Sequence, residues 1–148
     1  MALSAAEVIP LPGRPCVLVV DDEHMVRVLL QLGLERDGFE VRVADSGREA
    51  IEFYREHRDQ IAVVLVDVRM PGLDGVQTLK ALREINPEVL ACFMSGDPGG
   101  YNLDELVHCG AASVIAKPFH LDQLANTLRQ LAQGAPVELS ASAEGCRE

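Results

Sequence analysis

Side chains with useful chemistry stand directly after four runs of apolar residues. In chain order they are Asp21 with Asp22, then Asp67, Ser95 and Lys117. Short apolar runs rich in β-branched residues are typical of strands that are covered on both faces. The carboxyl ends of parallel strands meet at one edge of a sheet, and ligands of open α/β folds bind at that edge. We therefore predict that these five side chains share one site.

The residue types at this site predict metal and phosphoryl chemistry. Three converging carboxylates repel one another unless a cation is present. Hard oxygen ligands suit Mg²⁺, which keeps several waters and accepts one or two carboxylates together with phosphate oxygens. Lys117 would pair with a tetrahedral anion, and Ser95 would donate a hydrogen bond to it. An aspartate can act as the nucleophile and become an acyl phosphate, while metal and lysine neutralise the charge on the transferring group.

Each of these residues alone also has an ordinary interpretation. An Asp-Asp pair after a strand is often a helix cap, and a lysine before a proline is a common loop residue. Asp67 precedes Met70-Pro71-Gly72, so a turn would also explain it. The functional interpretation depends on all of them falling at the carboxyl ends of strands in one alternating fold.

The elements that would position the site alternate along the chain. Apolar runs predict strands at 17–20, 61–66, 89–94 and 112–116, and alternation of apolar and polar residues predicts a half-buried or edge strand at 39–44. Helical periodicity or cap signatures predict helices near 26–38, 46–54, 74–86, 103–109 and 121–133. Five strands and five helices in strict alternation predict right-handed βαβ units, with a parallel sheet covered by helices on both faces.

Length and charge limit the class of protein. The chain has 148 residues, enough for one domain with a proper core, and a net charge of −10. Residues 1–15 and 134–148 are predicted to be tails, the second one flexible, around a domain at 16–133. That domain holds 11 basic and 19 acidic residues. Nucleic acid is therefore not expected as the main partner, because such binding requires cationic side chains.

The cellular location is expected to be the cytoplasm. No apolar run approaches the roughly 18 residues of a membrane span, and Pro10 and Pro12 interrupt the apolar N-terminal stretch, so neither a membrane helix nor a signal peptide is predicted. The four cysteines show no Cys-x-x-Cys spacing. They are expected to be reduced thiols.

The strongest signal is an ordered set of motifs: VLVVDDE at 17–23, VLVDVRMPGLDG at 64–75, FMSG at 93–96 and GAASVIAKPF at 110–119. The separations are 45 residues from Asp22 to Asp67, 28 from Asp67 to Ser95 and 22 from Ser95 to Lys117. With these motifs the chain resembles the receiver domain of bacterial two-component response regulators, of the stand-alone type seen in the chemotaxis response regulator. The resemblance covers essentially the whole predicted domain.

The resemblance implies a flavodoxin-like fold with strand order 2-1-3-4-5. It implies that Asp67 takes a phosphoryl group from a phosphohistidine on a sensor histidine kinase or histidine phosphotransfer protein. Mg²⁺ would be bound by Asp22, Asp67 and the backbone carbonyl of Arg69, with help from Asp21. Ser95 and Lys117 would contact the phosphoryl group, and the Lys117–Pro118 peptide bond would be cis.

Four positions depart from the family pattern or tune it. Val114 stands where the family often has an aromatic switch residue, so a signal would pass through the Ser95 loop, the backbone or another side chain such as Tyr101. His120 replaces the usual acidic cap of the last helix. Arg69 and Asp97 flank the site and would either pair across its mouth and hinder water or form an ordinary solvated surface pair.

The leading hypothesis is a single-domain regulator that catalyses only its own phosphorylation and dephosphorylation. Few residues follow the last helix, so no DNA-binding output domain is expected in this chain. Output would pass to a protein target through the Tyr101–Gln133 face by a population shift, either as the end of a pathway or midway in a phosphorelay. Weak homodimerisation is also expected.

Three other functions remain open. The chain would be a phosphorylation-independent adaptor if the pocket is a relic, which Val114 favours and the intact acidic set opposes. It would be a receiver cut from a longer hybrid kinase if the reading frame extends further, although the initial Met1 favours a complete chain. An aspartyl-phosphate phosphatase would need an acid two residues after Asp67, where Arg69 stands instead.

Overall fold

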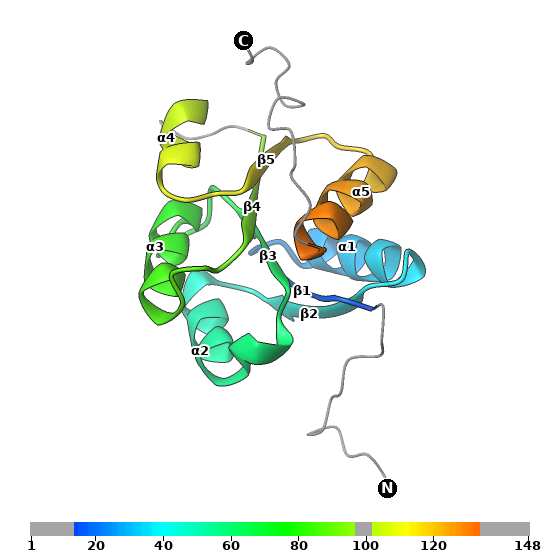
Figure 1. Ribbon diagram of the computed structural model, residues 1–148. Coiled ribbons are helices and arrows are strands. Elements are labelled where there is room, and N and C mark those ends of the chain that lie inside the picture. The colour runs from blue at the N-terminus through cyan, green and yellow to red at the C-terminus, as the bar shows by residue number, and fades with distance from the viewer. Residues whose placement is uncertain (1–13, 97–101, 134–148) are drawn as a thin grey trace, which may run out of the picture.

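Five parallel strands form the centre of the structure, a computed structural model that describes residues 14–96 and 102–133. The order in the sheet is β2-β1-β3-β4-β5, as Figure 1 shows. The flavodoxin-like doubly wound fold predicted from the sequence is confirmed. The strands are β1 (Cys16–Val20), β2 (Glu40–Ala44), β3 (Val63–Asp67), β4 (Ala91–Ser95) and β5 (Ser113–Ala116).

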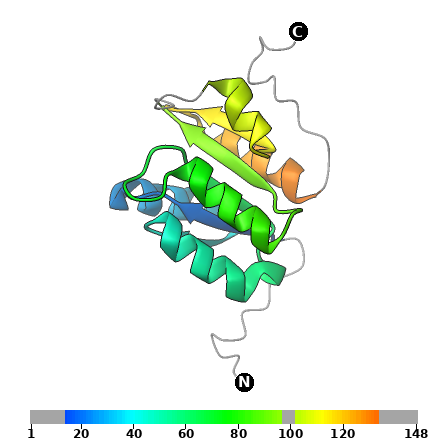
Figure 2. The same cartoon turned by 90° about the vertical axis from the view of Figure 1, so that its left-hand side faces the viewer.

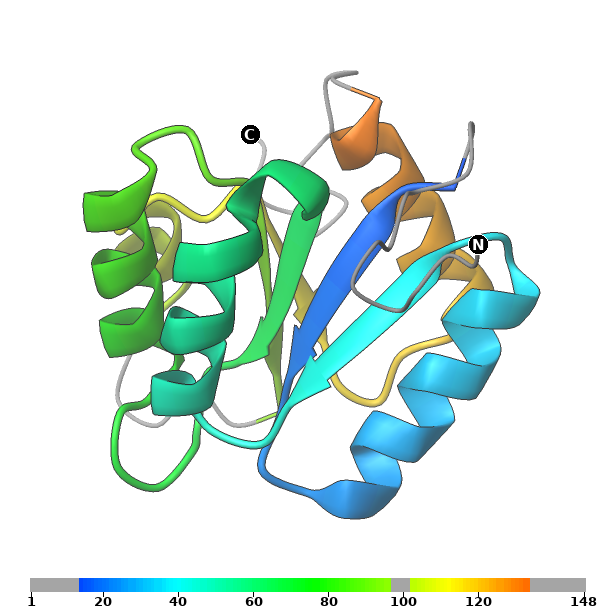
Figure 3. The ribbon, with the colours of Figure 1, turned by 90° about the horizontal axis from the view of Figure 1, so that it is seen from below.

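Helices cover both faces of the sheet. Two of them, α1 and α5, lie on one face, and α2, α3 and α4 lie on the other (Figures 1 and 3). Figure 2 looks onto the face that carries α2, α3 and α4. The helices are α1 (His24–Arg36), α2 (Gly47–His57), α3 (Gly75–Ile85), α4 (Leu103–His108) and α5 (Leu121–Ala132), and a short 3₁₀ helix, η2 (Arg58–Gln60), follows α2.

Apolar side chains of the central strands alternate between two cores. Leu18, Val64 and Val66 belong to the cluster under α2, α3 and α4, whereas Val19 and Leu65 belong to the cluster under α1 and α5. All five are fully buried. This explains the continuous apolar runs in the sequence, because a strand that is covered on both faces needs an apolar residue at every position.

The helix starts follow their cap residues. The Ser46 side chain accepts a hydrogen bond from the Glu49 backbone N–H, but the Glu49 carboxylate accepts from Asp45 instead of returning to Ser46. The predicted capping box is therefore only half formed. The boxes at Asp74 with Gln77 and at Asn102 with Glu105 are complete, and the second was missed in the sequence.

Two strands are shifted along the chain relative to the prediction: β3 and β4 begin two residues later than expected, at Val63 and Ala91, and end one residue later. β3 and β4 were expected to end at residues 66 and 94, but they end at Asp67 and Ser95. The cause is pairing with neighbouring strands, since Asp67 stands opposite Met94 and Ser95 opposite Ala116. These two polar side chains are thus fixed by strand geometry and do not belong to loops.

Other expectations have mixed outcomes. Arg14 and Pro15, placed before the predicted domain, hydrogen-bond to it through the Phe39 carbonyl and the Glu40 backbone N–H. The predictions for Asp97, Tyr101 and the 134–148 segment lie outside the described residues. None of the helices in the described parts of the chain is both long and apolar enough to cross a membrane.

Candidate functional site

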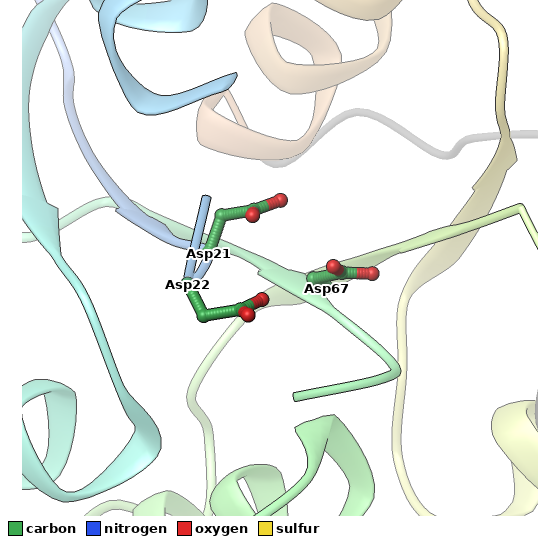
Figure 4. Close-up of side chains that lie close together, drawn as sticks. All are labelled: Asp21, Asp22 and Asp67. Atoms are coloured by element: carbon green, nitrogen blue, oxygen red, sulfur yellow. The ribbon is translucent and has the colours of Figure 1, made fainter. Parts of the chain in front are cut away.

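Three aspartates meet at the carboxyl ends of β1 and β3, as the sequence predicted. Asp21 and Asp22 follow β1, and Asp67 is the last residue of β3. One carboxylate oxygen from each lies within 4.8 Å of the others. Figure 4 shows the three side chains projecting to the same side of the strand ends. Asp21 is 0% exposed and Asp67 8% exposed, whereas Asp22 is open to solvent.

Backbone contacts fix Asp21 in this position. Its N–H donates to the Ala44 carbonyl of β2 at 3.2 Å, which extends the β1–β2 pairing by one residue. Its Oδ1 accepts from the Glu23 N–H at 2.8 Å, and the Arg27 guanidinium donates to its carbonyl at 2.8 Å. Its Oδ2 is buried and, among the described residues, has no hydrogen-bond partner. An anionic oxygen in that state requires a nearby cation.

Lys117, the residue after β5, supplies the positive charge from the far side of β4. Its Nζ lies 3.4 Å from Asp67 Oδ2 and 3.6 Å from Asp21 Oδ2. The lysine N–H donates to the Ser95 carbonyl at 2.9 Å, which ties its backbone to β4. The Lys117–Pro118 peptide bond is cis, so that prediction is confirmed.

Burial dominates the electrostatics of Asp67. The pKa of this carboxyl is raised from 3.8 to about 6, and loss of solvent is the largest cause. The Lys117 ammonium opposes that rise, the negative charge of Asp21 adds to it, and hydrogen bonds with Lys117 and the Arg69 backbone lower it again. The carboxylate is therefore ionised at neutral pH, but it is held in an environment that favours neutralisation by a proton or a cation.

Ser95 and Arg69 occupy the positions that the sequence assigned to them, at the same edge of the sheet. Ser95 ends β4, between β3, which ends at Asp67, and β5, which Lys117 follows, and its side chain is half-buried. Arg69 follows β3, is exposed, and hydrogen-bonds to Asp67 through its backbone. Their proposed contacts with a phosphoryl group and a metal ion remain predictions.

Two residues that support the site were missed in the sequence. Arg27 lies one turn into α1 and anchors Asp21. Gly75 opens α3 so close to β3 that a Cβ there would collide with the Asp67 carbonyl oxygen. The Asp74-Gly75 pair before an apolar helix was the available signal for the glycine. Nothing in the spacing identified Arg27.

The donor set fits a hard divalent cation. Three carboxylates offer oxygen ligands, one of them with a buried oxygen that lacks a hydrogen-bond donor. Mg²⁺ and Ca²⁺ prefer such oxygens, and no thiol or imidazole belongs to the cluster. The site is therefore an acidic cluster whose oxygen atoms suit such a cation, with one lysine on its edge.

Comparison with known proteins agrees with this geometry. Residues 17–129 match the response regulator receiver domain. The chain belongs to this family. The regulatory protein AtoC of Escherichia coli is 37% identical over 109 residues, which are 73% of this chain and 23% of AtoC. The sensor kinase CckA of Brucella abortus is 36% identical over 124 residues, 82% of this chain and 13% of CckA.

A solved structure of a receiver domain has the same fold as this chain. A response regulator receiver domain protein from Clostridium thermocellum superposes with a TM-score of 0.77 at 28% identity, covering 81% of this chain and 95% of that one. The receiver domain therefore spans less than a quarter of AtoC and of CckA but nearly all of this solved structure.

The departures from the family pattern are visible in the structure. Val114 lies in β5 opposite Phe93, half-buried against the core under α2, α3 and α4. No aromatic ring stands at this position to move on signalling. His120 precedes α5 and makes no side-chain hydrogen bond to the start of that helix.

Proposed function

We propose that this receiver domain accepts a phosphoryl group on Asp67. One Oδ of Asp67 attacks the phosphorus of a phosphohistidine, the P–N bond breaks, and the imidazole leaves and regains its ring proton. The product is an acyl phosphate. The chain catalyses only this transfer and the later hydrolysis of the acyl phosphate.

One observation carries this proposal: the Lys117 ammonium stands 3.4 Å from Asp67 and 3.6 Å from Asp21. A single ammonium balances the charge of a single carboxylate, so Asp21, Asp22 and Asp67 together leave the cluster with excess negative charge even beside Lys117. That excess suits a divalent cation, and the lysine can then pair with an incoming phosphoryl oxygen.

Asp21, Asp22 and Asp67 are the residues that would hold Mg²⁺, together with the Arg69 carbonyl that the family resemblance adds. When bound, Mg²⁺ neutralises charge on the phosphoryl oxygens. The protein's own contribution is positioning. The β1–β2 and β3–β4 pairing fixes two of the carboxylates, and Ser95 at the end of β4 is placed to donate to the phosphoryl group.

The phosphoryl donor would dock on the exposed face of α1. Met25, Leu29 and Leu32 on this helix are 71%, 56% and 64% exposed. They recur at helical spacing, and the helix starts directly after Asp22 and Glu23, so an apolar stripe leads to the acidic pocket. A histidine kinase or histidine phosphotransfer protein that covers this stripe could present its phosphohistidine to Asp67.

Output is proposed to pass to a protein partner, or to a further phosphotransfer step, from the 101–133 face. Lys117 lies in the loop between β5 and α5, and α4 lies beside β5. A change at Lys117 or Ser95 would therefore reach this face through β5. A cytoplasmic location follows from the same role.

Labelling with acetyl phosphate tests the proposal. Wild-type protein incubated with acetyl phosphate and Mg²⁺ should gain the mass of one phosphoryl group on Asp67, and EDTA should prevent the gain. Asp67→Asn is the matched variant that should stay unlabelled. A folded wild-type protein that gains no mass would refute the proposal, and normal labelling of Asp67→Asn would place the acceptor elsewhere.

A phosphorylation-independent adaptor is the second candidate, and Val114 is the observation that favours it. Without an aromatic ring at this position, the usual side-chain movement cannot report phosphorylation. If partner capture from native extract is equal for wild type, for phosphorylated wild type and for Asp67→Asn, this candidate replaces the first.

The chain is also similar to part of a sensor kinase, since CckA of Brucella abortus matches it over 13% of the length of CckA. A receiver within a hybrid kinase would perform the same chemistry on Asp67 but would receive the phosphoryl group within its own polypeptide. The genomic reading frame around this chain distinguishes the two arrangements.

A further inference from the structure

A second charged pocket lies far from the aspartates, at the end of the domain where β1 and β2 begin. Its volume is about 350 Å³, and it lies between the last residues before β1, the turn from α1 to β2, and the C-terminal end of α5. The strands are about five residues long, so the pocket is about 16 Å from the acidic site along the sheet. It takes no part in the proposed phosphoryl transfer.

Two arginines from distant parts of the chain converge on one turn here. Arg14 donates through one terminal nitrogen to the Phe39 carbonyl at 3.1 Å. Arg129 of α5 donates to the Asp37 carbonyl at 2.8 Å, and its guanidinium stacks over the Phe39 ring at 5.3 Å. Arg14 and Arg129 both line the pocket, so two positively charged side chains border one small space.

The hydrogen-bonding capacity of these arginines is not used up. A guanidinium has five N–H donors, and within the described residues one bond from Arg14 and one bond from Arg129 are present. The Nε of Arg14 is buried and has no partner in the described chain. A buried N–H without an acceptor is unfavourable, and an anion that accepts from it would remove that cost.

Charge points to the same ligand. One acidic residue, Asp37, lines the pocket, and no ion pair among the described residues joins it to either arginine. In a chain with a net charge of −10, this is a local excess of positive charge. The Arg14 Nε and a terminal nitrogen form the fork that matches a planar carboxylate.

We propose that the pocket between Arg14 and Arg129 is a carboxylate-binding site that ties the start of β1, the α1–β2 turn and the end of α5 together. Two sources could supply the carboxylate. One is a free small dicarboxylate, and the other is the chain itself. Gln133 lines the pocket, and Glu138 follows five residues later, within a reach of about 17 Å, while Glu7 precedes Arg14 by seven residues.

Succinate is the probe for the free source. It is titrated into the full chain and into the double variant Glu7→Gln/Glu138→Gln at constant ionic strength, with chloride and inorganic phosphate in parallel. The readouts are the ¹H–¹⁵N resonance of Arg14 Nε and the melting temperature. We expect a saturable resonance shift and a rise of about 3 °C, both lost in Arg14→Gln and kept in Arg36→Gln, an exposed arginine that does not line the pocket.

The outcomes separate the two sources. A response to succinate in the full chain supports a free ligand. A response only in the double variant, whose melting temperature without succinate falls below that of wild type, supports a carboxylate of the chain itself. No Arg14-dependent response in either protein overturns the proposal. A response to phosphate that saturates at lower concentration than the response to succinate also overturns it, because the ligand would then be a tetrahedral anion.

Discussion

At the scale of single residues, Asp67 is held in a compromise between reactivity and stability. A nucleophilic carboxylate must be ionised, yet burial at the end of β3 raises its pKa to about 6. Lys117 keeps the ionised form accessible at neutral pH, and Asp21 opposes it. The same arrangement that disfavours the bare carboxylate favours its conversion to a metal-bound or phosphorylated form.

This compromise predicts that Asp67→Asn stabilises the metal-free protein. The folded-state pKa is about 6 and the ordinary value is 3.8, so between these values the folded state binds more protons than the unfolded state. The free energy of unfolding of wild type therefore falls as the pH rises from about 4 to about 6, and the loss is complete above that. Asparagine does not ionise, so the free energy of unfolding of the variant should exceed that of wild type by about 1–3 kcal/mol at pH 7.

Urea unfolding in EDTA at pH 4, 5, 6 and 7 measures this difference. The gap between Asp67→Asn and wild type should open with rising pH and then level off. Asp22→Asn, at an exposed position, serves as the control and should show a smaller gap. If the difference in unfolding free energy between Asp67→Asn and wild type is constant across this pH range, ionisation of Asp67 does not destabilise the folded state.

A second residue-scale prediction concerns Lys117→Ala. Because the ammonium lies 3.4 Å from Asp67 but is no metal ligand, its removal should leave Mg²⁺ affinity largely intact, as measured by isothermal titration calorimetry. Phosphorylation should no longer shift the amide resonances of β5 and α5, since the contact that transmits the change is gone. Equal resonance shifts in the variant and in wild type would show that Lys117 does not transmit the effect of phosphorylation to β5 and α5.

At the scale of elements, the alternation of strands and helices could be predicted because each signal is local. Apolar runs marked four of the strands, alternation of apolar and polar residues marked the other one, and Asp74 with Gln77 marked the start of α3. The ends of β3 and β4 could not be predicted, because pairing of Asp67 and Ser95 with neighbouring strands decides them. The 3₁₀ helix η2 was missed for a similar reason, since three polar residues, Arg58–Gln60, carry no periodicity.

The exposed stripe of α1 gives an element-scale prediction. Leu29→Lys changes a side chain that is 56% exposed, so the fold should tolerate it within about 0.5 kcal/mol. Phosphotransfer from the cognate histidine kinase, found by profiling the kinases of the source organism, should slow by about tenfold or more because an apolar contact is replaced by a charge. Labelling by acetyl phosphate should not change.

The matched control for this stripe is Val43→Lys, which adds the same charge to another exposed apolar residue, on β2. Transfer from the kinase should stay near the wild-type rate in this variant. If both variants slow transfer equally, the effect is general electrostatics, and α1 is not the docking surface.

A different element, the start of α3, is predicted to limit the geometry of the site. In Gly75→Ala the new Cβ would collide with the backbone of Asp67 and Val68, which cannot yield as a flexible side chain would. The variant should lose about 1–3 kcal/mol of unfolding free energy and should be labelled more slowly by acetyl phosphate. Gly96→Ala meets Lys117 side-chain carbons at 3.4 and 3.6 Å, an ordinary contact, and should lose less stability. Equal losses in both variants would contradict this account.

At the scale of the whole molecule, the sequence predicted the acidic site but not the basic one. Asp21 and Asp22 follow β1 and Asp67 ends β3, so the topology alone brings them to one edge of the sheet. Arg14 and Arg129 have no such rule. They meet because the chain approaches β1 beside the end of α5, and only the packed structure shows that both reach the α1–β2 turn.

The charge of the whole chain leads to the last prediction, on metal binding. A net charge of −10 weakens the folded state by self-repulsion, and the three clustered carboxylates concentrate that repulsion at one point. Mg²⁺ that binds only the folded state, at ten times its dissociation constant, should add about 1.4 kcal/mol to the free energy of unfolding, or about 3–5 °C in melting temperature relative to EDTA.

Asp22→Asn removes an exposed ligand without disturbing the core and should lose most of this rise. Sodium chloride at matched ionic strength should produce little of it in either protein, because screening acts on all the surface charges and not on this cluster alone. An equal rise in wild type and Asp22→Asn would mean that the cation acts on the acidic surface at large and that the three aspartates do not form its site.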